Sequence, residues 1–102
     1  MATEDRQFVK RCQRCRRPRR FRCTNRFRVN ANGKSIDVWL LFACGSCGTT
    51  AKLPVLERVA VSMIGRARLE AFETNDRREV TVAVRDVTLL RRAGFTIQEA
   101  VT

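Results

Sequence analysis

Two short cysteine motifs carry the residue types in this chain that are best suited to chemistry. Cys12 and Cys15 form one Cys-x-x-Cys pair, and Cys44 and Cys47 form a second. Two cysteines separated by two residues can bind one metal ion from a tight turn, and a second such turn completes the tetrahedron of thiolates typical of structural Zn²⁺. Because the chain has no histidine, we expect an all-cysteine site that holds one structural zinc ion per chain.

The four cysteines leave two other chemistries open. The same thiolate cage can hold iron, so ligand type alone does not decide the metal. Redox-active Cys-x-x-Cys pairs usually lie at the N-terminus of a helix in a βαβ unit, and neither pair follows that pattern here. Zinc is therefore the favoured cofactor.

The fifth cysteine, Cys23, lies between Phe21 and Phe27 in an alternating segment that predicts a strand. On the apolar face of such a strand a free cysteine behaves as a small hydrophobic residue, so we expect Cys23 in the core. The alternative is that Cys23 replaces Cys12 as the fourth ligand. An odd number of cysteines also argues against a framework of disulfides.

An arginine-rich segment surrounds the first cysteine pair. From Lys10 to Arg28 there are ten basic residues and no acidic one, and the first 34 residues hold twelve Lys or Arg against Glu4 and Asp5, a net of +10 out of the +11 of the whole chain. Such density is unfavourable through self-repulsion unless a polyanion is near, and the planar guanidinium group fits phosphate oxygens. We therefore expect nucleic acid as the partner, with RNA favoured over DNA. The candidate binding residues are Arg11, Arg14, Arg16, Arg17, Arg19, Arg20, Arg22, Arg26, Arg28 and Trp39.

Trp39 has two interpretations. An exposed aromatic ring among arginines can stack on an unpaired base. Alternatively, the ring covers the hairpin or packs under the C-terminal helices, with Arg26 in a cation–π contact. The arginines themselves have a simpler interpretation as a solvated, solubilising face, and acidic protein or anionic membrane surfaces are further partners. No amphipathic basic helix supports the membrane.

Alternation of apolar and polar residues predicts a β-hairpin as the element that positions both cysteine motifs. Residues 21–29 place phenylalanine, cysteine and valine on one face and arginine on the other, and residues 36–42 alternate in the same way. The Asn-Gly pair at 32–33 is a turn signal between the two strands. Folding of this hairpin brings both cysteine pairs to the same end of the sheet. The expected register sets Val29 opposite Ile36, Phe27 opposite Val38, Arg26 opposite Trp39 and Cys23 opposite Phe42.

The second half of the chain predicts one more strand and a set of helices. Residues 49–61 are rich in β-forming types, and Pro54 favours an edge position for this third strand. Ser62 can cap a following helix. Asp86 precedes a short helix that Gly94 can end.

Residues 76–84 fit two interpretations. Asp76 followed three residues later by Glu79 resembles a capping box at the start of a helix. The valines within residues 80–84, however, alternate as they would in a strand. The local pattern leaves the choice open.

These elements predict a small α+β protein, a zinc ribbon with a three-stranded antiparallel sheet followed by a short helical extension. The expected divisions are a flexible leader over residues 1–10, the zinc-ribbon domain over 11–61 and the helical extension, packed on that domain, over 62–102. The N-terminus has no apolar region typical of a secretory signal, and the longest apolar run, Val38–Cys44, is too short to span a bilayer. A cytoplasmic location, where cysteines stay reduced, is the expectation.

Part of the sequence resembles a known family. F-R-V-N-A-N-G-K over 27–34, D-V-W-L over 37–40, A-C-G-S-C over 43–47 and L-E-R-V over 56–59 are similar to a bacterial family of uncharacterised proteins, domain-of-unknown-function family 1062. The resemblance extends from about residue 12 to residue 95, and it implies a helical region over residues 75–84. Larger relatives continue into a segment similar to an S4-type RNA-binding module, which implies RNA, in a ribosomal setting, as the partner by analogy.

No catalytic constellation is expected. A four-cysteine cage leaves no open metal position, and the chain lacks a histidine for general-base chemistry. We therefore expect a non-enzymatic, zinc-containing protein that binds nucleic acid and associates with RNA or the ribosome. The alternatives are a protein-interaction adaptor, whose apolar C-terminal helices dock a partner while the arginines steer association, and a thiol or metal sensor.

Overall fold

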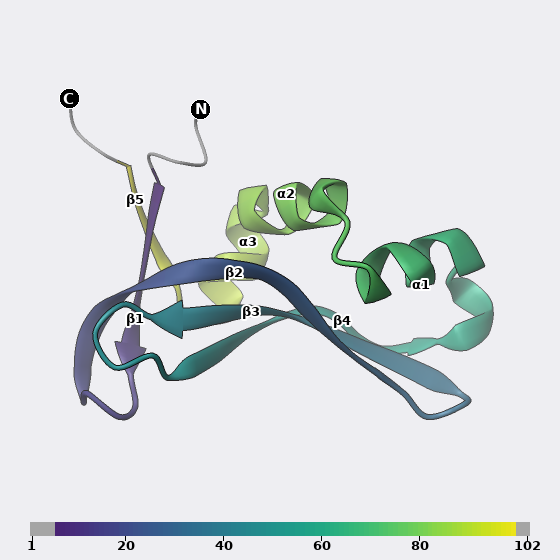
Figure 1. Ribbon diagram of the computed structural model, residues 1–102, viewed down its shortest axis with the longest axis horizontal. Helices are drawn as coiled ribbons and strands as arrows, with labels where there is room; N and C mark the ends of the chain where they lie inside the picture. The colour runs from purple at the N-terminus through teal and green to yellow at the C-terminus, as the bar shows by residue number, and fades with distance from the viewer. Residues whose placement is uncertain (1–5, 100–102) are drawn as a thin grey trace.

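An antiparallel sheet of five strands forms the framework of the chain, which a computed structural model describes over residues 6–99 (Figure 1). In spatial order the strands are β4-β3-β2-β1-β5. The strands are β1 (Arg6–Cys12), β2 (Arg17–Ala31), β3 (Ser35–Cys44), β4 (Thr50–Ala60) and β5 (Thr96–Glu99), and between β4 and β5 lie a 3-10 turn (Val61–Met63) and the helices α1 (Arg66–Glu73), α2 (Arg77–Arg85) and α3 (Val87–Arg92). The expected α+β class is confirmed, whereas the expected number of three strands is wrong.

The two additional strands lie outside the segment that the sequence assigned to the sheet. β1 includes residues 6–10, which the sequence analysis treated as part of a flexible leader; residues 1–5 lie outside the described residues. Its alternation was hidden because Lys10 faces inward between the buried Phe8 and Cys12. The Lys10 Nζ donates a hydrogen bond of 2.6 Å to the carbonyl oxygen of Ala93, which gives the inward-facing ammonium group a polar partner. β5 is a short strand that pairs only with β1, so it depends on a contact that no local pattern encodes.

The β2–β3 hairpin differs from the expected register near its turn. Val29 pairs with Val38 instead of Ile36, a shift of two residues. The central turn residues are Gly33 and Lys34, because the Asn32 N–H bonds to the Ser35 carbonyl at 3.1 Å and the Asn32 side chain accepts from the Ser35 N–H. A shift of two leaves every side chain on its expected face. The apolar inner face therefore survives the error.

A bulge in β2 restores the expected register farther from the turn. Between Cys23 and Phe27 β2 advances four residues while β3 advances two, so Cys23 faces Phe42 as predicted. Asn25 takes a left-handed conformation with φ of 59°, which asparagine tolerates better than most residues. The Phe27 N–H, which faces away from the regular ladder, donates to the Asn75 side chain at 2.7 Å. The bulge thereby attaches the α1–α2 turn to the sheet.

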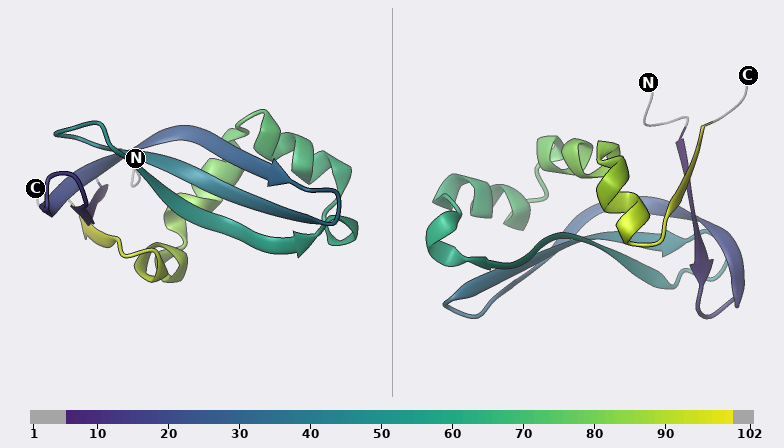
Figure 2. Two further views of the ribbon diagram at one scale, coloured as in Figure 1. Left: turned by 90° about the horizontal axis from the view of Figure 1, so that it is seen from below. Right: turned by 180° about the vertical axis from the view of Figure 1, so that it is seen from behind.

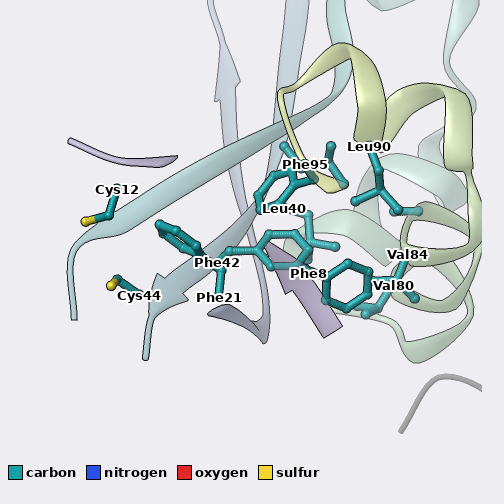
Figure 3. Close-up of a cluster of buried hydrophobic side chains, with 12 residues drawn as sticks. Phe8, Cys12, Phe21, Leu40, Phe42, Cys44, Val80, Val84, Leu90 and Phe95 are labelled. Carbon is teal, nitrogen blue, oxygen red and sulfur yellow. The ribbon is translucent and has the colours of Figure 1, made fainter. Parts of the chain in front are cut away.

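All the helices lie on one side of the sheet, as the views in Figures 1 and 2 show. Every second residue of β3, from Ile36 to Cys44, is buried beneath them. The larger part of this core includes Phe8, Phe42, Leu90 and Phe95 (Figure 3). Burial of these apolar side chains supplies the main driving force for the fold.

A smaller cluster covers the hairpin end of the sheet. Phe72 of α1 is fully buried against Ile36 and Val38. Its ring also meets Phe27 edge to face, with 5.1 Å between the ring centroids. This arrangement is favourable for aromatic pairs beyond the area that it buries.

The ambiguous segment 76–84 forms the helix α2. Val80 and Val84 are buried one helical turn apart, and Val82 is 62% exposed. A strand would put all three valines on the same side, so tertiary packing decides for the helix. The Asp76 side chain caps α2 by accepting from the backbone N–H of Arg78 at 2.8 Å.

The other predicted helix boundaries have mixed outcomes. Ser62 does not cap α1, because that helix begins at Arg66 after Gly65, and Ser62 lies in the 3-10 turn. The short helix after Asp86 is confirmed as α3, and the Asp86 side chain accepts from the Leu89 N–H at 3.0 Å. Gly94 follows this helix with φ of 93°, a conformation that favours glycine.

We predict that Phe72→Ala will destabilise the protein strongly, because it empties a fully buried site. The free energy of unfolding should fall by about 3–5 kcal/mol, measured by urea denaturation with circular dichroism. The exposed Val82 provides a matched control on the same layer, and Val82→Ala should change the free energy by less than about 0.5 kcal/mol. Similar losses in both variants would contradict the packing described for α1.

Candidate metal centre

The two turns that carry the cysteine pairs lie at the same end of the sheet, on either side of β2. Cys12 ends β1 and Cys15 lies in the following turn, while Cys44 ends β3 and Cys47 lies in the turn to β4. Across the strands Cys12 pairs with Arg17 of β2, and Cys44 pairs with Phe21 of the same strand. Figure 3 shows Cys12 and Cys44 at one end of the apolar core, beyond Phe21 and Phe42.

The four sulfur atoms have the spacing of a tetrahedral metal site. All of the Sγ atoms of Cys12, Cys15, Cys44 and Cys47 lie within 4.8 Å of one another. The Sγ atoms of Cys12 and Cys47 are 3.5 Å apart, and those of Cys15 and Cys44 are 4.0 Å apart. A tetrahedron with metal–sulfur bonds of about 2.3 Å requires sulfur–sulfur distances of about 3.8 Å. These four residues therefore fit one metal ion bound by four thiolates.

Backbone and hydroxyl donors already point at the sulfurs. The Cys15 N–H approaches the Sγ of Cys12, and the Ser46 N–H approaches the Sγ of Cys44, both at 3.4 Å. The Thr49 hydroxyl lies 2.9 Å from the Sγ of Cys47. Donors of this kind stabilise the thiolate, which is the form that binds metal.

The thiols of the cluster perturb one another. The Thr49 side chain and backbone lower the pKa of Cys47 to about 6, and backbone N–H groups, that of Cys47 foremost, lower the pKa of Cys44. Arg19 acts to lower the pKa of Cys15, but desolvation and the three neighbouring thiols outweigh it and raise that pKa to about 11. Four adjacent thiolates repel one another, so complete deprotonation requires a cation among them.

Arg19 lies at this cluster instead of on the far side of β2. It faces the same side as Phe21 and pairs with Lys10 of β1, and its guanidinium acts to lower the pKa of the Cys15 thiol. Its Nε is shielded from solvent and has no hydrogen-bond partner among the described side chains of residues 6–98. Four thiolates around a divalent ion leave a net charge of about −2. A guanidinium at this position offsets part of that charge.

Cys23 does not join the cluster; the structure groups Cys12 with the other three cysteines. Cys23 is half-buried and packs against the larger core. Its Sγ lies 3.7 Å from the Asn25 side-chain oxygen, and burial raises the pKa of its thiol. These contacts agree with the expectation of a core residue.

The remaining arginines are divided among several positions. On β2, Arg20 and Arg22 lie on either side of the buried Phe21 and so face away from the core. Beyond the bulge, Arg28 pairs with Trp39. These side chains therefore project from the side of the sheet opposite the helices, which we call the open face. Figure 2 shows the helices on the other side. Of the predicted nucleic-acid residues, Arg11, Arg20, Arg22, Arg28 and Trp39 lie on the open face, Arg14 and Arg16 lie in the β1–β2 turn, Arg17 and Arg19 face the same side as Cys12, and Arg26 is exposed in the bulge.

Trp39 is half-buried in the middle of the open face. Its cross-strand neighbours are Arg28 on β2 and Pro54 on β4. The residues on either side of it in β3 are fully buried toward the helices, so the ring does not pack under the helices. The cation–π contact expected with Arg26 is formed instead by Lys52, whose Nζ lies 5.2 Å from the ring centroid.

Sequence reasoning missed two residues of these sites. Thr49 contacts the cluster and lies two positions after Cys47. A hydroxyl residue so close in sequence to a predicted ligand could have been identified from the local sequence. Lys52 reaches Trp39 only through the pairing of β3 with β4. That pairing cannot be read from local sequence.

Comparison with known proteins identifies the family. Residues 29–102 match the model of the family described as "Protein of unknown function (DUF1062)". Because this match covers more than half of the chain, the chain belongs to that family. No match was found among curated proteins or solved structures. Among the described residues, no helix is long and apolar enough to cross a bilayer.

We predict that the cluster binds one tetrahedral metal ion and that Cys23 takes no part. Titration of reduced, metal-free protein with Co²⁺ should saturate at one ion per chain, with the intense thiolate charge-transfer bands of a four-sulfur site. Cys44→Ser should weaken binding and alter the spectrum, because it removes one thiolate. Cys23→Ser is the matched control and should leave both unchanged. A spectrum that depends equally on Cys23 would contradict the assignment.

Proposed function

We propose that this chain is a cytoplasmic, non-enzymatic nucleic-acid-binding protein, with RNA or the ribosome as the favoured partner, and that one structural zinc ion holds its sheet. The observation that carries the proposal is the row of exposed arginines that β2 presents on the open face, Arg20, Arg22 and Arg28. The zinc and the nucleic acid rest on separate observations.

Zinc is the metal that best suits the cluster. Four thiolates in a tetrahedron are the ligand set of closed, structural zinc sites. All four positions around the ion would be taken by protein, so no position remains for water or substrate. The role that follows is mechanical: the ion would tie the β1–β2 turn to the β3–β4 turn across β2.

The charges on the open face support a polyanionic partner. Among the described side chains, those of residues 6–98, no carboxylate lies within ion-pair distance of Arg20, Arg22 or Arg28. Asp37, which projects from β3 on the same face, already accepts a hydrogen bond of 2.8 Å from the backbone N–H of Arg58. Unpaired guanidinium groups in a row repel one another, and phosphate groups relieve this repulsion.

The spacing of these arginines also suits a sugar-phosphate backbone. Arg20 and Arg22 lie two residues apart on a strand, hence about 7 Å apart along it. That spacing is on the order of the distance between successive phosphates in an extended nucleic acid strand. Each contact with a phosphate releases counterions, so binding would depend steeply on salt.

We predict that protein purified without added metal contains one zinc ion per chain by elemental analysis. Removal of the metal with a chelator should abolish much of the native circular dichroism, because the free energy of structural zinc binding is largely folding free energy. Addition of Zn²⁺ should restore the signal. Iron in the purified protein would contradict the choice of metal, and an unchanged fold after complete removal would contradict the structural role.

We predict that replacement of Arg20, Arg22 and Arg28 together by Gln weakens binding to a generic RNA. For a single-stranded RNA, the slope of log K against log salt concentration should become shallower by about 2, since three phosphate contacts are lost. The matched control replaces Arg66, Arg78 and Arg85, exposed arginines on the helix side, and should keep the slope. Flat salt dependence in the unaltered protein would reject nucleic acid and favour the adaptor.

A further inference from the structure

We infer that the open face around Trp39 is a platform for single-stranded nucleic acid, on which an unpaired base stacks against the Trp39 ring. This inference rests on the proposed function and specifies the form of nucleic acid that the face accepts. The flanking cations Arg28 and Lys52 contact the phosphates on either side of the stacked base.

The middle of this face is apolar. Trp39, Leu41 and Pro54 lie on adjacent strands, point away from the helices and are only half-buried. Apolar side chains gathered on a solvent-facing surface commonly mark a binding site. Among residues 6–99, the helices all lie on the other side of the sheet (Figure 2), so this surface can receive a partner.

Positive charge borders the apolar centre. Arg28 pairs with Trp39 from β2, and Lys52 pairs with Leu41 from β4, so cations flank the centre on both sides. Farther along β2, Arg22 pairs with Ala43 of β3 and continues the basic border. An apolar centre with a basic border fits a ligand that has flat apolar rings joined by phosphates. A protein partner would need an acidic rim of the same shape.

The Trp39 ring has a cation over one of its faces. The Lys52 Nζ lies over a π face of the indole, 5.2 Å from the ring centroid, so the group over this face is an exposed side chain. Because Lys52 is exposed, a base can replace it on the ring while its ammonium moves to a phosphate. Stacking between a base and an aromatic residue tolerates any base, because every base has a π face.

The same geometry disfavours a duplex on this face. In a duplex the bases are stacked on each other, and their π faces are not available to Trp39. A duplex would use only the phosphate contacts of the arginines. The open face therefore distinguishes the two forms through Trp39 alone.

Trp39 is the only tryptophan of the chain, which also contains no tyrosine, so its fluorescence reports directly on the platform. The experiment titrates the zinc-loaded protein with a short oligouridylate and, separately, with an RNA duplex of the same length. We expect the oligouridylate to quench Trp39 fluorescence and the duplex to bind without comparable quenching. Equal quenching by both, or binding of the oligouridylate without quenching, would overturn the platform.

Variants of Trp39 supply the second measurement, with a labelled oligonucleotide followed by fluorescence anisotropy. Trp39→Leu should weaken binding of oligouridylate roughly 5- to 100-fold and leave duplex affinity unchanged, since one stacked base is lost. Trp39→Phe should recover part of the affinity, and circular dichroism verifies that both variants are folded. Equal losses for both ligands would overturn the inference.

The outcomes separate the two proposals. Salt-dependent binding that requires the arginines but ignores Trp39 would keep the proposed function and reject the platform. Absence of binding to either RNA would reject both. Preference for the single strand, quenching and the loss in Trp39→Leu together would establish the platform.

Discussion

The convergence of four cysteine sulfurs at one end of the sheet is the constraint on which the rest of the structure depends. β2 carries arginine at most of its solvent-facing positions, and a strand with so much like charge would be weakly held by burial alone. The cysteine turns lie on both sides of it, one joined to β1 and the other to β3. The arginine-rich strand β2 is therefore the strand that the two cysteine turns flank. Thiolates in these turns place negative charge beside the positively charged strand.

The structure gives the arginines different tasks by face. Arg19 turns inward to the Cys15 thiol and adjusts the electrostatics of the cluster, whereas Arg20, next in sequence, points to solvent on the open face. The period of two in a strand makes this division automatic. The arginines of β2 form one basic segment in the sequence. In the structure, Arg19 supplies positive charge beside the cluster, whereas Arg20 and Arg22 form part of a row on the open face without acidic partners among the described side chains.

Much of the inner structure followed from short-range pattern, because the signals are local. Cysteine spacing identified the cluster, alternation identified the buried face of β2 and β3, and Asp86 and Gly94 marked the ends of α3. What the sequence could not supply was long-range. The strand β5 forms by pairing with β1. The segment α2 is a helix because Val80 and Val84 are then both buried in the core. The β2 bulge is held by a hydrogen bond to Asn75 of the α1–α2 turn. The two-residue shift of the β2–β3 register near Gly33 left the same side chains buried, because residues two positions apart on a strand lie on the same face.

The cluster and the open face are also joined directly through the backbone. Gly45, inside the second cysteine turn, donates its N–H to the carbonyl oxygen of Arg20 at 2.8 Å. A Cβ at this position would lie 3.0 Å from the same oxygen, so the close approach requires glycine. The turn that carries Cys44 and Cys47 is therefore hydrogen-bonded to the residue that begins the arginine row. Any metal that orders this turn would also fix the position of Arg20, which gives the cluster an influence on the open face although none of its sulfurs reaches it.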